Sequence, residues 1–294
     1  MWQAISDDIA KLTNCDFRIV KVEQLASGDI NQAYKICSQQ QCYFVKTNSK
    51  QHLDLFSAEA LNLDLLNCSD ELTVPDVVSY GTTNDRSYLV LEYLDMHPSP
   101  LPPLSADFYQ LGVALANLHS ANQQAEFGWP EDNFIGLTPQ VNDYHDNWHE
   151  FFCENRLGFQ LDLLAQKSVV IDKQDILARC TALLSSHQPI PCLVHGDLWS
   201  GNIGFTKTSP CLFDPACYYA DREVDIAMSE LFGRFDDSFY AGYNDTAPLD
   251  SGYQQRKVVY NFYHILNHAN MFAGSYLAQV NTFIKQIQKL SSKP

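Results

Sequence analysis

The first hundred residues alternate between short apolar strands and turns, and one helical pattern interrupts them. Three segments within residues 17–46 (FRIVKVEQL, AYKICS and QCYFVK) are separated by turn-like residues, which predicts a small antiparallel sheet. YLVLEYL at residues 88–94 predicts one more buried strand. Between them, residues 51–67 place three leucines and one glutamate on one face at spacings of three and four, which predicts an amphipathic helix: Leu55, Glu59, Leu63 and Leu66.

Beyond residue 95 the pattern becomes helical. A Pro-rich segment at residues 97–104 is typical of a connection between two lobes. Helical periodicity then continues to the end of the chain, with one short β interruption between residues 190 and 214. We therefore expect an α+β protein with two lobes: a small β-sheet lobe with one helix in residues 1–95, and a larger, mainly helical lobe in residues 96–294.

Composition excludes several classes of protein. Of the 294 residues, 46% are apolar and 18% are charged, which is the balance of a globular chain. No run approaches the roughly 18 apolar residues that span a bilayer, and the N-terminus lacks the pattern of a signal peptide. These features predict a cytoplasmic protein without a membrane segment.

Charge and cysteine content narrow the possible partners. The net charge of -16 repels phosphate backbones and anionic lipid, which disfavours nucleic-acid binding. The same charge would attract a cationic substrate, although an acidic surface that only aids solubility explains it equally well. The nine cysteines include no CxxC pair, so we expect free, mostly buried thiols and neither a zinc site nor a redox pair.

The strongest chemical signal is LVHGDLWSGNIGF at residues 193–205, followed by CLFDPA at residues 211–216. Phosphoryl transfer needs a carboxylate that accepts or orients the proton of the attacking hydroxyl, and oxygen ligands for magnesium. Asp197 fits the first role, and Asn202 with Asp214 fits the second. His195 is interpreted as a structural residue that orients the loop by hydrogen bonding.

The spacing of these residues also predicts a geometry. NIGF and CLFD read as two short strands joined by a turn, and in a simple hairpin Asn202 would lie opposite Asp214. Their Cα atoms would then be about 5 Å apart, so one metal could reach both side chains. The alternative is that these Asp and Asn residues only cap turns and strand ends, which is a common function of both residue types.

Three runs in this region resemble the fructosamine/ketosamine 3-kinase family: HGDLWSGN (195–202), FDPA (213–216) and YADREVDIAMSELFG (219–233). FGWPEDNFIGLTPQVND (127–143) also resembles that family, and the similarity covers essentially the whole chain. The family belongs to the aminoglycoside-phosphotransferase-like group of the protein-kinase-like fold. Gly196, where protein kinases carry Arg, and Asp-Pro-Ala in place of Asp-Phe-Gly indicate this small-molecule group.

The resemblance implies a nucleotide site in the N-terminal lobe. Lys46, at the end of QCYFVK, would contact the α- and β-phosphates of ATP. Glu59 would be its partner, because a carboxylate on the apolar face of a helix is costly unless it is paired. The alternative is a solvated lysine and an exposed helix edge.

Other candidate positions carry weaker signals. Gly28 lies in a loop (25–34) that would cover the phosphates but lacks a full GxGxxG, so a plain hairpin turn explains it nearly as well. Trp199 could stack on the sugar of an acceptor or wedge the loop onto the larger lobe. The resemblance suggests that the acidic residues at 221, 223 and 225 brace the catalytic loop. It also places the residues that bind adenine at an expected hinge, where the alternative is an ordinary strand end: Glu92, Tyr93 and Leu94.

Taken together, the resemblance implies an enzyme that uses ATP and Mg²⁺ to phosphorylate the sugar 3-hydroxyl of a ketosamine, such as fructosamine or ribulosamine on lysine or on free amines. The unstable product would make this a protein deglycation, or repair, reaction. One alternative is a kinase of another small amine or amino alcohol, such as an aminoglycoside or choline. A second is a catalytically silent binding module, which loss of Asp197, Asn202 or Asp214 would have marked; all three are present.

Overall fold

A computed structural model describes residues 1–25, 30–96 and 104–291 of the chain. The chain forms two compact units: Met1–Pro103 together with Ile203–Pro215, and Leu104–Asn202 together with Ala216–Pro294. The short segment 203–215 thus groups with the N-terminal residues. The division into lobes at residue 95 stays a prediction.

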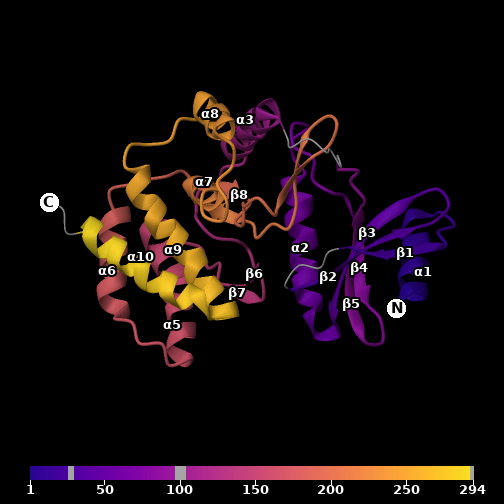
Figure 1. Ribbon diagram of the computed structural model, residues 1–294, viewed down its shortest axis with the longest axis horizontal. Helices are drawn as coiled ribbons and strands as arrows, with labels where there is room; N and C mark the ends of the chain where they lie inside the picture. The colour runs from indigo at the N-terminus through magenta and orange to yellow at the C-terminus, as the bar shows by residue number, and fades with distance from the viewer. Residues whose placement is uncertain (26–29, 97–103, 292–294) are drawn as a thin grey trace. The chain divides into compact units, whose positions relative to one another are not determined.

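The first unit is built around a five-stranded sheet with the strand order β1-β2-β3-β5-β4 (Figure 1). Every neighbouring pair is antiparallel, which confirms the predicted sheet. β3 is the central strand, so a residue on it is held by hydrogen-bonded neighbours on both sides. The strands are β1 (Lys21–Gln24), β2 (Gln32–Cys37), β3 (Cys42–Ser49), β4 (Val77–Thr82) and β5 (Arg86–Glu92).

Two helices cover opposite sides of this sheet in Figure 1: α1 (Trp2–Thr13) and α2 (Leu53–Leu66), the latter preceded by a 3₁₀ turn, η1 (Lys50–His52). Ile5 and Ile9 of α1 pack with Val45 of β3 and with other buried side chains of the sheet. Because side chains alternate along a strand, Lys46 points to the side opposite Val45, where α2 lies. The predicted helix at 51–67 is confirmed; α1 and β4 were not predicted.

A short hairpin completes the first unit, and it corrects the predicted register. β9 (Ile203–Phe205) pairs with β10 (Pro210–Leu212) in an antiparallel manner, with Ile203 opposite Leu212. The predicted pairing of Asn202 with Asp214 would require Ile203 to face Phe213, so the expected ladder is wrong by one residue. The error arose because the turn comprises residues 206–209 and is one residue shorter than the predicted turn of residues 206–210. The length of the turn sets the register of a hairpin.

The expectation that all nine cysteines are free is also wrong. Cys37 and Cys42 form a disulfide across the β2–β3 hairpin. The two residues are directly opposite each other in the register, which brings their Cα atoms within 4.1 Å. A search for CxxC pairs cannot find such a bond, because the proximity comes from strand pairing. The other seven cysteines are free thiols, and five of them are buried as predicted.

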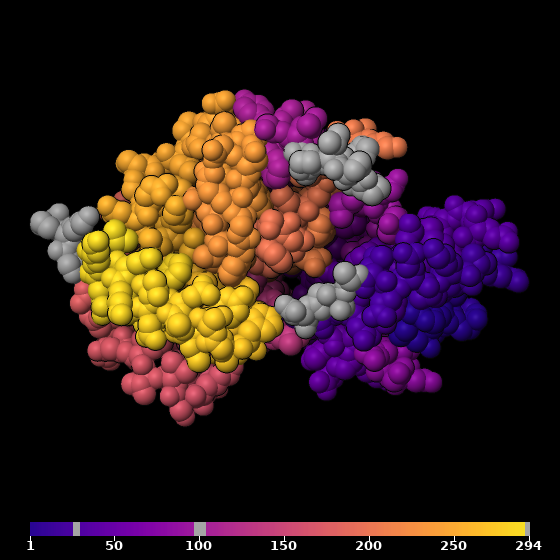
Figure 2. All heavy atoms as spheres, in the orientation of Figure 1, coloured from indigo at the N-terminus to yellow at the C-terminus, as the bar shows by residue number. Residues whose placement is uncertain are grey.

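The second unit is mainly helical, with two small two-stranded ladders, β11-β8 and β6-β7. α10 lies against α9, and its residues form part of the surface seen in Figure 2. No helix within the described ranges is both long and apolar enough to cross a membrane. The elements of this unit are α3 (Ser105–Ala121), β6 (Asn133–Ile135), β7 (Thr138–Gln140), α4 (Trp148–Phe151), the π-helical η2 (Phe152–Gly158), α5 (Phe159–Gln166), α6 (Lys173–Leu184), β8 (Cys192–Val194), β11 (Tyr218–Ala220), α7 (Glu223–Ser229), α8 (Asp237–Thr246), α9 (Tyr253–Phe272) and α10 (Ser275–Ser291).

Helices α3 and α8 pack unusually close together because glycines line their contact. A Cβ atom on Gly112 of α3 would lie 2.1 Å from the carbonyl oxygen of Phe239, and one on Gly242 of α8 would lie 2.2 Å from that of Tyr109. No side chain fits at either position. Near its C-terminal end, α3 carries a histidine, His119, that bonds Tyr243 of α8 and matters for the site below.

Candidate active site

Lys46 lies at the centre of a buried ion-pair cluster in the first unit. Its Nζ is 2.6 Å from Oε1 of Glu59 on α2, and it also donates a hydrogen bond to Oδ1 of Asp214. The lysine is 5% exposed, and the side chains of Glu59 and Asp214 are 13% and 45% exposed. The predicted pairing of Lys46 with Glu59 is therefore confirmed, and Asp214 joins the same cluster.

The charges of this cluster keep Lys46 protonated. Burial alone would lower the pKa of Lys46, but the carboxylates of Asp214 and Glu59 more than compensate and raise it above its ordinary value. Asp214 adopts a positive φ of 58°, which is uncommon for a residue with a side chain. An ammonium group fixed between two carboxylates is suited to bind phosphate oxygens when a nucleotide enters.

Removing the Lys46 charge is expected to weaken nucleotide binding and to destabilise the fold. In Lys46→Met, the buried Glu59 loses its cation, which should cost about 3 kcal/mol of unfolding free energy. The Kd for ATP should rise about tenfold or more, because a charged hydrogen bond to phosphate is lost. Urea denaturation and calorimetric titration measure the two effects. Lys50→Met, at an exposed position in η1, is the control, and an unchanged Kd in Lys46→Met would contradict the assignment.

The predicted catalytic loop begins where β8 ends in the second unit. β8 is entirely buried and pairs with β11, with Val194 opposite Tyr218. Gly196 has a φ of 80°, and a Cβ atom there would lie 2.1 Å from the carbonyl oxygen of Ala216. The amide of Ala216 in turn donates to the carbonyl oxygen of His195 at 2.8 Å. A glycine before Asp197 is therefore required by close backbone packing.

Asp225 of α7 accepts hydrogen bonds from the backbone of this loop. Its carboxylate accepts the amide protons of His195 at 2.7 Å and of Gly196 at 2.9 Å. It also contacts Nε2 of His119 at 3.1 Å, and Nδ1 of His119 is 2.9 Å from the hydroxyl of Tyr243. Burial alone would raise the pKa of Asp225, but the hydrogen bonds from His119 and His195 hold it below its ordinary value.

Of the three acidic residues predicted to brace the loop, Asp225 is confirmed in that function, whereas Asp221 bonds His187 and Tyr260 and Glu223 bonds Arg256. The arrangement also adds a residue that the sequence analysis missed. His119 lies at the end of α3 among buried leucines, in the run LANLH, and it is almost fully buried itself. A histidine on the apolar side of a helix was the available signal. Its partner, however, is 106 residues away in sequence, so no local pattern could identify it.

Within the loop, Asp197 and Asn202 bond to each other. Nδ2 of Asn202 donates to the carbonyl oxygen of Asp197 at 2.8 Å and to its Oδ2 at 3.2 Å. The amide of Asp197 donates to Nδ1 of buried His195 at 3.2 Å, so His195 has the structural function predicted for it. These bonds fix the direction of the Asp197 carboxylate, which is what a group that orients a hydroxyl needs.

The remaining candidates have mixed outcomes. Trp199 is half-buried, makes an edge contact with Phe232 at 6.5 Å between ring centroids, and lies over Gly201; its stacking on a substrate stays a prediction. The amide of Glu92 donates to the carbonyl oxygen of Asp76, so it is engaged within the sheet. Adenine binding at residues 92–94 stays a prediction. Gly28 lies outside the described residues.

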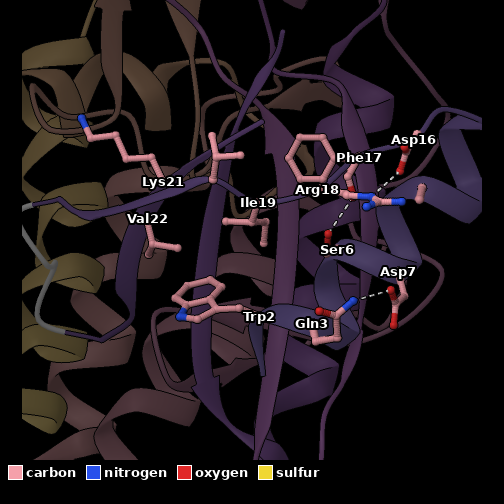
Figure 3. Close-up of a pocket in the computed structure, with 12 residues that line it drawn as sticks. Trp2, Gln3, Ser6, Asp7, Asp16, Phe17, Arg18, Ile19, Lys21 and Val22 are labelled. Atoms are coloured by element: carbon pink, nitrogen blue, oxygen red, sulfur yellow. Dashed lines mark hydrogen bonds and ion pairs between the residues drawn. The ribbon is translucent and has the colours of Figure 1, made fainter. Parts of the chain in front are cut away.

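One groove in the first unit is separate from these residues. It has a volume of about 750 Å³ and lies between α1 and the segment that leads into β1 (Figure 3). Trp2, Ile19 and Val22 lie around it, together with charged side chains such as Arg18 and Asp16. None of the predicted site residues that the structure describes lines this groove, so it is not the candidate active site.

The donor atoms fit the magnesium ion that the fold implies. Asp214 supplies carboxylate oxygens on a half-exposed side chain, and Asn202 supplies an amide oxygen while its Nδ2 is directed at Asp197. Carboxylate and amide oxygens are the ligands that this hard cation prefers. Metal binding by these two residues stays a prediction.

A β-sheet unit with a buried Lys–Glu pair, joined to a helical unit with an H-G-D loop, defines the class: a phosphotransferase with the protein-kinase-like fold. The sequence model of the family described as fructosamine kinase matches residues 1–290. The chain belongs to this family. It is 45% identical over 290 residues to a Vibrio vulnificus protein named "Probable ketoamine kinase", covering 98% of this chain and 99% of that one.

Solved structures agree with this assignment. A crystal structure of a "Putative fructosamine-3-kinase" from Haemophilus somnus 129PT has a TM-score of 0.91 and 33% identity, covering 98% of this chain and 97% of that one. A choline kinase from Streptococcus pneumoniae has a TM-score of 0.64 at 16% identity, covering 98% of each chain. The latter likeness shows the fold alone.

Proposed function

We propose that this protein transfers the γ-phosphoryl group of ATP to the sugar 3-hydroxyl of a ketosamine, carried on a lysine or a free amine. The observation that carries the proposal is the fixed Asp197 carboxylate, oriented by Asn202 and by the backbone bonds to Asp225, in a chain of the fructosamine kinase family. The names of the relatives, which include ketoamine kinase and fructosamine-3-kinase, support the acceptor class.

In the proposed mechanism, Lys46 binds the α- and β-phosphates of the nucleotide, and Asp197 accepts the hydrogen bond of the acceptor hydroxyl. The acceptor oxygen forms a bond to the γ-phosphorus as the bond to the β-phosphate oxygen breaks. The hydroxyl proton passes to Asp197 and then to solvent or to the product phosphate. Magnesium, held by Asn202 and Asp214, would neutralise charge on the phosphate oxygens. Residues 92–94 would bind adenine.

The product explains why such a reaction would serve protein repair. A phosphate at the 3-position is next to the keto carbon, so enolisation of the sugar expels it as inorganic phosphate. Hydrolysis of the remaining adduct by water frees the amine.

The use of ATP supports a cytoplasmic location for this reaction. The half-buried Trp199 and its neighbour Phe232 would provide an apolar wall for the sugar.

A comparison of phosphorylation rates on several candidate acceptors tests this proposal directly. The purified protein with ATP and magnesium should phosphorylate ribulose-lysine or fructose-lysine with kcat/KM at least about a hundredfold above that for an aminoglycoside or choline. Transfer of label from γ-³²P-ATP to each acceptor gives the rates. A preference for another amine would reassign the acceptor. Nucleotide binding without phosphorylation of any acceptor would make the protein a silent binding module.

A further inference from the structure

Arg156, in the π-helical segment η2, is fully buried without a carboxylate partner in the part of the chain that the structure describes. Its Nη1 donates to the carbonyl oxygen of Val141, and its Nη2 donates to Oδ1 of Asn142 at 2.7 Å. The rings of Phe151 and Tyr218 lie 4.7 and 4.1 Å from its Cζ. A buried cation without an opposite charge is costly, so we expect its hydrogen bonds to serve a specific function.

Asn142 is one of three buried side chains that bond to one another and that we call the amide cluster: Asn133, Gln140 and Asn142. Arg156 bonds the cluster through Asn142. Nδ2 of Asn142 donates to Oδ1 of Asn133 at 3.0 Å, and Nε2 of Gln140 donates to the same oxygen at 2.8 Å. Oε1 of Gln140 accepts the hydroxyl of Tyr263 at 2.9 Å. The cluster therefore ties the base of the β6–β7 hairpin to η2 and α9.

On its other side the amide cluster bonds the chain segment that supports the catalytic loop. Nδ2 of Asn133 donates to the carbonyl oxygen of Cys217 at 2.7 Å, and Nε2 of Gln140 donates to that of Ala216 at 3.2 Å. Ala216 is the residue whose amide bonds His195 and whose carbonyl packs against Gly196. A continuous path of contacts thus leads from Arg156 to the backbone just before Asp197.

The guanidinium and the backbone carbonyls around it together set the direction of the bonds along this path. Nδ2 of Asn142 also donates to the carbonyl oxygen of Glu131 at 3.1 Å. The guanidinium only donates, so Asn142 must turn its oxygen towards Arg156 and its Nδ2 towards Asn133. Asn133 must then use its oxygen as the acceptor and its Nδ2 as the donor to Cys217. Without a donor at position 156, the carbonyl oxygen of Val141 and Oδ1 of Asn142 lose their partner, which loosens the amide cluster and its hold on the carbonyls of Ala216 and Cys217.

We propose that Arg156 is a positioning residue for phosphoryl transfer, acting through the amide cluster on Ala216 and thereby on the catalytic loop. This inference rests on the proposed function of Asp197. It predicts a loss of kcat, because a displacement of about 1 Å at a reacting group can lower the rate about a hundredfold. It predicts little change in the KM for ATP, because the bonds described above are made within the second unit.

The test compares Arg156→Met, Gln140→Met and the double variant with the wild type. Each single variant should lower kcat about tenfold or more, the KM for ATP should stay within about threefold, and the double variant should be no slower than the slower single one. Non-additivity is the expected sign of one path. Arg156→Lys, which keeps the charge but not the paired donors, should recover only part of the rate.

Gln160→Met is the matched control, because Gln160 is an equally buried glutamine that bonds Asn267 and Asn270 of α9 but not the Ala216 segment. It should lower the melting temperature without lowering kcat. A kcat of Gln140→Met within about twofold of the control, or multiplicative losses in the double variant, would overturn the proposal. If Arg156→Met does not fold, the comparison of Gln140→Met with Gln160→Met still decides it. Rates are taken with whichever acceptor the wild type uses, or as ATP hydrolysis if the wild type uses none of the acceptors offered, so a wrong acceptor does not affect the comparison.

Discussion

Asp197→Asn is expected to lower kcat about a thousandfold while leaving the Kd for ATP nearly unchanged. Asparagine has almost the same shape, so the loop and its bond to Asn202 can persist, but an amide cannot accept the proton of the acceptor hydroxyl. The nucleotide is expected to contact Lys46, and that cluster does not include Asp197. Single-turnover transfer from γ-³²P-ATP measures the chemical step, and calorimetric titration measures the Kd.

Asp162→Asn makes the same change on the exposed surface of α5 and should leave both quantities as in the wild type. If Asp197→Asn retains kcat within about tenfold of the wild type, Asp197 is neither the base nor the group that orients the hydroxyl. A large loss of ATP affinity in the same variant would show instead that the loop had collapsed. The two measurements therefore separate a chemical function from a structural one.

The residues proposed to act on the acceptor hydroxyl could be found from the sequence because they lie close together along the chain. Asp197, His195 and Asn202 lie within eight residues of one another, and their mutual hydrogen bonds close a short loop. Glu59 was predictable for a different reason. A lone carboxylate on an apolar helix face needs a cation, and the preceding strand supplied Lys46 at the right distance along the chain.

The features that sequence analysis missed depend on contacts between distant segments or on single-residue shifts. The β9–β10 register is off by one because the length of the turn, and not the strand residues, decides which positions pair. The Cys37–Cys42 bond follows from a strand register. His119 and Arg156 act on segments 106 and 14 residues away, respectively, through side-chain bonds that no local pattern encodes.

Asp225→Asn is expected to cost about 3 kcal/mol of unfolding free energy, as much as Lys46→Met. The carboxylate accepts two backbone amides and contacts His119, and it is completely buried. An asparagine has one acceptor oxygen, so its NH₂ group must face either a backbone amide or the imidazole of His119. Equilibrium urea denaturation followed by circular dichroism measures this loss.

The same change should lower kcat of the folded protein about tenfold or more, because His195 and Gly196 immediately precede Asp197 and lose part of their anchor. Glu223→Gln is the matched control on the same helix. Glu223 is equally buried, but its carboxylate bonds Arg256 in a bidentate pair and does not contact the loop. It should destabilise the fold and leave kcat per folded molecule unchanged. If both variants lose stability and neither loses kcat, Asp225 stabilises the helical unit without positioning Asp197. The rigidity of the loop then has to come from its other contacts, among them the bonds of His195, Asn202 and Ala216.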